Sequence, residues 1–112
     1  MKLRKLGNLD LNVSEVGLGC MSFAGFYDPT TKEESFKCLD EARNVGIDFL
    51  DTAEMYGWGI SESIIGEYQS KNNYNFNVAT KGGIVKGAAR GPNDNSEQGL
   101  RNAIEGSLTR LN

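Results

Sequence analysis

Three short apolar runs along this chain are each followed by a polar loop and then by a helical pattern. The runs are residues 16–19, 47–50 and 76–80. Parallel strands need long crossover connections, so strands that alternate with helices at this spacing predict a parallel sheet with helices outside it. We therefore expect an α/β fold. The alternation alone does not distinguish an open sheet from a closed barrel.

Other local signals set the element boundaries that we expect. Apolar residues at every second position flank Gly7-Asn8, which predicts an N-terminal β-hairpin over residues 1–14. Thr31 and Glu34 have the spacing of a capping box, which predicts a helix over 32–45. Further along, we expect a helix from 60 or 61 to about 71, a loop over 84–95 and a last helix from about 96.

Composition argues against several classes of function. The chain has 112 residues with a net charge of −3 and no basic cluster, so nucleic acid is not an expected partner. No apolar run is long enough to span a membrane, and we expect a cytoplasmic protein. The chain contains no histidine, and the spacing of Cys20 and Cys38 fits no metal-binding motif, so no metal is expected.

An acid, a phenol and an amine stand just beyond the apolar runs. Asp51 and Lys81 follow the second and third runs, and Tyr56 lies in the loop after Asp51. Adjacent parallel strands end on one face of a sheet, so a salt bridge between Asp51 and Lys81 is expected. An ammonium beside a phenol favours the phenolate, and these side chains therefore predict a general acid. On spacing alone, solvated strand-end charges and a tyrosine packed at the rim remain an open alternative.

Four segments of the chain resemble the aldo-keto reductases. They are residues 17–22, 51–57, 79–81 and 107–111, and they occur in the family's order. The second segment has the specific pattern Asp-Thr-Ala-x-x-Tyr-Gly. The resemblance implies the N-terminal part of a (β/α)8 TIM barrel, a fold that needs roughly 250 residues. Residues 1–112 would form a single partial barrel domain, with the hairpin at 1–14 and about three β/α units over 15–112.

The resemblance also implies a reaction, the NAD(P)H-dependent reduction of a small aldehyde or ketone to an alcohol, with NADP(H) as cofactor rather than NAD(H). Tyr56 would protonate the carbonyl oxygen while hydride reaches the carbon, and Asp51 and Lys81 would complete the catalytic set. The implied cofactor contacts are Gly19, Cys20, Met21 and Asp51. The implied substrate contacts are Phe26, Tyr27 and Trp58, for which ordinary loop packing is the open alternative.

The family's fourth catalytic residue is a histidine after the next strand, and this chain has no histidine. Three β/α units alone would leave an unpaired strand edge and uncovered apolar helix faces. We therefore expect the chain to need the rest of the barrel, or self-assembly, to cover them. The alternatives to a reductase in the complete barrel are a truncated, catalytically inactive fragment and a non-enzymatic nicotinamide-binding module on the same fold.

Overall fold

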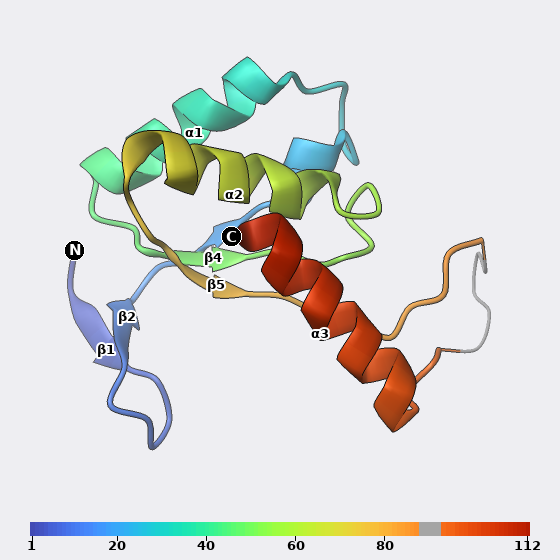
Figure 1. The fold of residues 1–112 in the computed structure, drawn as a ribbon. Helices are drawn as coiled ribbons and strands as arrows, with labels where there is room; N and C mark the ends of the chain where they lie inside the picture. The colour runs from blue at the N-terminus through green and yellow to red at the C-terminus, as the bar shows by residue number, and fades with distance from the viewer. Residues whose placement is uncertain (88–92) are drawn as a thin grey trace.

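The structure, a computed structural model, describes residues 1–87 and 93–112, so the centre of the loop predicted over 84–95 lies outside the described residues. The predicted hairpin is present: β1 (Leu3–Lys5) pairs antiparallel with β2 (Asn12–Ser14). Its apolar side chains are mostly exposed, and only Val13 among them is buried. The hairpin lies beside the body of the molecule (Figure 1), because Ser14 ties it to the start of β4 through the Asp48 carboxylate.

The predicted parallel sheet is also confirmed. It consists of β3 (Leu18–Gly19), β4 (Phe49–Asp51) and β5 (Asn77–Ala79), in that order, with a short 3-10 helix, η1 (Met21–Ala24), after β3. Gly19 is level with Asp51, and Asp51 is level with Ala79. The carboxyl ends of all three strands therefore lie at one edge of the sheet. Each strand is shorter than its apolar run in the sequence.

The first helix, α1 (Lys32–Asn44), starts at the predicted residue and ends one residue before the predicted end. The Thr31 side chain accepts from the Glu34 backbone, and the Glu34 side chain accepts from the Thr31 backbone, which completes the capping box. At the other end, Gly46 takes a φ of 81°, and the Ile47 N–H donates to the Ala42 carbonyl. This Schellman geometry needs a left-handed residue, which glycine supplies without strain.

Two further helices cover the sheet, α2 (Ile60–Asn72) and α3 (Glu97–Leu111). In Figure 1, α1 and α2 lie side by side over one face of the sheet, and α3 runs obliquely past β5 and meets α2. The core forms between the first two helices and the strands. Each large apolar side chain buried there stabilises the fold by about 1.5–3 kcal/mol. The core side chains are Cys20, Phe23, Leu39, Leu50, Ile64, Ile65, Tyr68 and Phe76.

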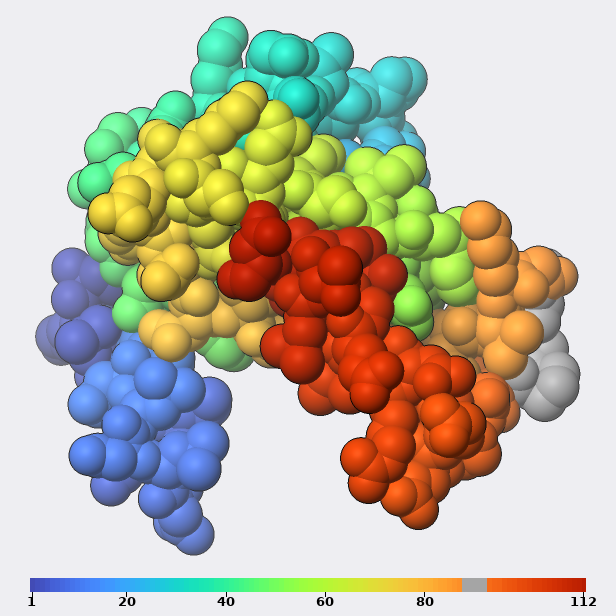
Figure 2. Space-filling view, in the orientation of Figure 1, coloured from blue at the N-terminus to red at the C-terminus, as the bar shows by residue number. Residues whose placement is uncertain are grey.

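Most apolar side chains of α3 lie outside this core, and only Leu111 among those described packs against it. Leu100, Ile104 and Leu108 are 44%, 58% and 64% exposed, whereas Ser107 is buried. The N-terminal part of α3 and the hairpin project from the same side of the body and leave an open gap between them (Figure 2). Within the described part of the chain, no helix is both long and apolar enough to cross a membrane.

Replacing Gly66 by alanine should test how closely α2 and α3 approach. An added Cβ would collide with the Arg110 carbonyl oxygen and lie 3.1 Å from the Leu111 carbonyl carbon. Although alanine is normally better than glycine in a helix by about 1 kcal/mol, we expect a loss of about 1–3 kcal/mol in the free energy of unfolding. The measurement is urea denaturation of the full-length protein.

Gly106→Ala is the matched control, because the atoms nearest to its new Cβ belong to the Arg110 side chain, at 3.0 Å for Nη1, and not to the backbone of α2. It should leave the urea midpoint unchanged or raise it. Equal behaviour of the two variants would contradict a backbone contact between the helices at Gly66.

Candidate active site

The expected ion pair between Asp51 and Lys81 is present at the carboxyl edge of the sheet. Asp51 is the last residue of β4, and Lys81 lies two residues beyond β5. The Lys81 Nζ donates to Asp51 Oδ1 at 2.6 Å and to the Thr52 carbonyl oxygen at 2.7 Å. Both side chains are half-exposed, so the pair adds little to stability. Its effect is to hold an ammonium at a defined point above the strand ends.

The surroundings of Lys81 favour its charged form. Partial burial is the largest single influence and lowers the pKa of Lys81, but the hydrogen bond and charge of Asp51, together with Tyr56, outweigh it. The net result is a pKa above the usual value for lysine. The amine is therefore an ammonium at neutral pH.

Tyr56 lies in the turn between β4 and α2. The Lys81 Nζ is 5.3 Å from the centroid of its ring, and Phe26 contacts the same ring edge-on with centroids 5.9 Å apart. The turn continues through Gly57 and Trp58 with positive φ angles of 66° and 53°. A Cβ at Gly57 would lie 2.8 Å from the Ile60 side chain, so this turn requires glycine there.

The predicted cofactor contacts at the end of β3 differ in their exposure to solvent. Gly19 is exposed, and nothing beyond its neighbours lies within 4 Å of where its Cβ would be. Cys20 is completely buried, its N–H donates to the Asp51 carbonyl, and its own carbonyl accepts from Ser61 Oγ. Met21 is half-buried at the start of η1. Cofactor contact at these residues stays a prediction.

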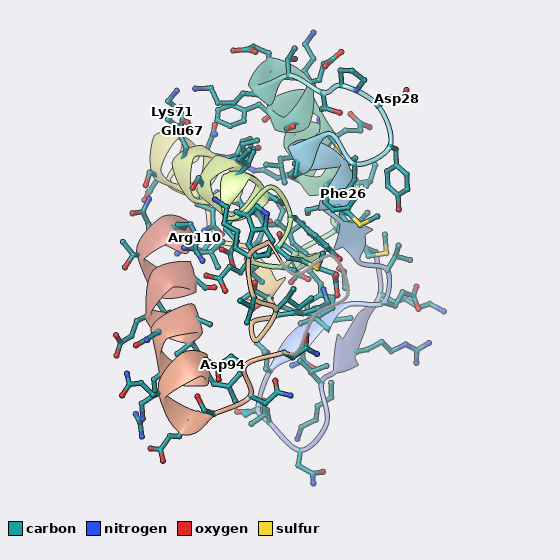
Figure 3. The ribbon with its side chains drawn as sticks, turned by 90° about the vertical axis from the view of Figure 1, so that its right-hand side faces the viewer. Phe26, Asp28, Glu67, Lys71, Asp94 and Arg110 are labelled. Atoms are coloured by element: carbon teal, nitrogen blue, oxygen red, sulfur yellow. The ribbon has the colours of Figure 1, made fainter. Side chains whose placement is uncertain are left out.

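The three predicted substrate residues have different surroundings in the structure. Phe26, labelled in Figure 3, is half-exposed. Its ring contacts that of Tyr56, so it borders the site. Trp58 lines a cavity of about 310 Å³ together with Glu54, Ile84 and Lys86. Tyr27 is the most exposed of the three, at 72%. Their contact with substrate also stays a prediction.

Sequence reasoning missed a buried acid behind the site. The Glu62 side chain is fully buried on α2, where it accepts a hydrogen bond from Thr80 Oγ1 at 2.6 Å and one from Arg110 Nε at 2.6 Å. One signal could have found it: Glu62 stands three and seven residues before the buried Ile65 and Gln69, which places all three on one face of a helix.

Metal ligands do not gather around these groups. Over residues 1–87 and 93–112, no group of three or more His, Cys, Asp or Glu side chains lies close enough to hold a metal ion.

The chain is similar in sequence and in structure to known oxidoreductases. The family described as the Aldo/keto reductase family matches residues 15–112. An uncharacterized oxidoreductase of Bacillus subtilis, YqkF, is 41% identical over 99% of this chain. A Schizosaccharomyces pombe protein named aldo-keto reductase yakc [NADP(+)] is 33% identical over 96% of this chain. The holo form of aldo-keto reductase AKR11C1 from Bacillus halodurans superposes with a TM-score of 0.82 at 34% identity over 99% of this chain.

The chain spans only about a third of these relatives. It covers 35% of YqkF, 32% of the yeast protein and 36% of the Bacillus halodurans structure. The matched part has the β-hairpin and the parallel β/α units described above.

The two cysteines should differ sharply in reactivity. Burial, the largest influence, raises the pKa of Cys20 to about 12, and its thiol is shielded from solvent. Cys38 is exposed on α1. Brief alkylation of the native protein at pH 8, followed by peptide mass spectrometry, should label Cys38 and spare Cys20 until the protein is unfolded. Rapid labelling of Cys20 in the native protein would contradict its burial.

Proposed function

This chain belongs to the aldo/keto reductase family, and on that premise we propose that it supplies part of an enzyme that reduces an aldehyde or ketone to an alcohol. In this proposal residues 1–112 are one partial barrel domain: the hairpin at 1–14 and the first three β/α units at 15–112. The rest of a barrel would cover the exposed apolar side chains of α3.

The observation that carries the proposal is the placement of Tyr56 against the Lys81–Asp51 pair. In the proposed reaction the phenolic O–H bond of Tyr56 breaks, and its proton passes to the carbonyl oxygen. The phenolate that remains is stabilised by the Lys81 ammonium 5.3 Å from the ring centroid. Asp51 holds that ammonium in place through the 2.6 Å ion pair. The three residues thus act as one general acid.

A nicotinamide coenzyme, when bound, supplies the hydride. The open side of Gly19 fits a ring that approaches the strand end, because no side chain occupies that space. Asp51 is level with Gly19 in the sheet and would border the same ring. Cys20 would contribute shape only, since its thiol and both backbone polar groups are engaged inside the protein. We propose NADP(H) as the coenzyme, supported by the name of the yeast relative.

Replacing Tyr56 by phenylalanine should abolish reduction. The variant lacks the proton donor, so we expect kcat for a model aldehyde such as 4-nitrobenzaldehyde to fall by about 10²–10⁴-fold. Binding of NADP(H), followed by quenching of protein fluorescence, should be unchanged. The assay uses the full-length protein and monitors NADPH oxidation.

Tyr74→Phe is the matched control, because that ring packs against Phe76 and Arg43 and takes no part in the proposed site. It should keep the activity of the wild type. Turnover by Tyr56→Phe equal to the wild type would overturn the assignment of the acid. A wild-type protein that binds coenzyme without turnover would instead establish a nicotinamide-binding module, and one that does neither would establish an inactive fragment.

A further inference from the structure

We propose that Glu62 and Arg110 are positioning residues, which hold the backbone around Lys81 from behind the sheet and so fix the ammonium against Asp51. This inference rests on the proposed function, because it assigns a purpose to the position of Lys81. Neither residue contacts the groups that would react. Their effect would be transmitted through Thr80 and Glu54.

The first argument is the cost of burying Glu62. Its side chain is fully buried, and a buried carboxylate is costly unless its oxygens are paired. Both oxygens are paired: Oε1 accepts from the Thr80 hydroxyl and Oε2 accepts from Arg110 Nε, each at 2.6 Å. An ion pair of this kind is often no more stabilising than well-packed apolar side chains. The presence of a charge here therefore requires a reason other than stability.

The second argument is what the pair holds. Thr80 directly precedes Lys81 in the chain, and its hydroxyl is fixed by Glu62. On the other side, the Glu54 N–H donates to the Lys81 carbonyl at 3.0 Å, and the Glu54 carboxylate accepts from Arg110 Nη2 at 3.2 Å. The Arg110 guanidinium thus binds both Glu62, which holds Thr80, and Glu54, which holds the Lys81 carbonyl. The peptide that carries Lys81 is held at its preceding side chain and at its own carbonyl.

The third argument is that Gly59 lacks the side chain that would block Arg110. Its side chain extends from α3 where that helix meets α2 (Figure 3). A Cβ at Gly59 would lie 2.6 Å from Arg110 Cδ, so a glycine makes the passage possible. Gly59 also has a φ of 97°, which other residues adopt with strain. The turn that carries Tyr56 therefore ends on the residue that admits Arg110.

A purely structural tie between α2 and α3 would not need this charge. The two helices already touch through backbone at Gly66, and Gln69 Nε2 donates to the Leu111 carbonyl at 3.1 Å. Lys81, in contrast, is half-exposed, and a lysine side chain carries up to about 2 kcal/mol of rotamer freedom. Anchoring its backbone limits where the ammonium can reach, and a displacement of about 1 Å can cost roughly 100-fold in rate.

The test compares Glu62→Gln and Thr80→Val with Glu67→Gln in the full-length protein. Glu67 is the matched control, because it lies on the same helix and pairs with two cations, Lys32 and Lys71, at the outer edge of α2 (Figure 3). We expect kcat to fall about 10- to 100-fold in the first two variants, with the descending limb of the kcat–pH profile moved to higher pH. Thr80→Ser, which keeps the hydroxyl, should retain the wild-type kcat and the wild-type kcat–pH profile. Glu67→Gln should also match the wild type in both.

A second measurement does not depend on turnover. Lysines methylated with ¹³C-formaldehyde report their own pKa by NMR, with Lys81→Arg used to assign the Lys81 signal. Asp51 and Tyr56 are the groups that face Lys81 and raise its pKa. In Glu62→Gln and Thr80→Val the pKa of Lys81 should fall toward the ordinary lysine value, and in Glu67→Gln it should not change.

An unchanged Lys81 pKa in both variants would overturn the positioning role, whatever the activity. If the pKa moves but the wild type shows no turnover, the positioning role stands and the proposed reaction fails. Should Glu62→Gln lose its folded circular dichroism spectrum, Thr80→Val decides the question alone, because it removes one hydroxyl and leaves the buried ion pair intact.

Discussion

The register of three short parallel strands is the constraint on which the candidate site depends. Because Gly19, Asp51 and Ala79 are level, the chain leaves the sheet at one edge in all three units. Lys81 then lies within 2.6 Å of Asp51, although thirty residues separate them in sequence. A slip of one residue would turn every side chain of the strand to the opposite face and would destroy this contact.

Between this edge of the sheet and α2, the protein interior contains hydrogen-bonded polar side chains. Thr52 Oγ1 donates to Ser61 Oγ, and Ser61 Oγ donates to the Cys20 carbonyl, while Glu62 joins Thr80 and Arg110. These contacts connect the loops after all three strands to α2. Satisfied polar networks of this kind hold one geometry, because each lost partner would leave a buried polar group unpaired. The loops are thus held from the interior, while Asp51 and Lys81 at the same edge stay half-exposed.

One side of α3, in contrast, exposes apolar side chains to solvent. The sequence predicts that three β/α units alone leave apolar helix faces uncovered, and Leu100, Ile104 and Leu108 on this helix are more than 40% exposed. The helix contacts α2 through Arg110 and the close approach at Gly66. The chain covers about a third of its relatives' length.

Local patterns in the sequence determined the hairpin, the capped first helix and the order of strands and helices, and they favoured the pairing of Asp51 with Lys81 that the structure then established. These features depend on neighbouring residues or on the rule that parallel strands end at one edge. The structure alone decided that Glu62 is buried, that Arg110 reaches both Glu62 and Glu54, and that Cys20 is sealed while Gly19 is open. Such contacts join residues far apart in sequence, and their existence depends on how α2 and α3 pack, which no local pattern encodes.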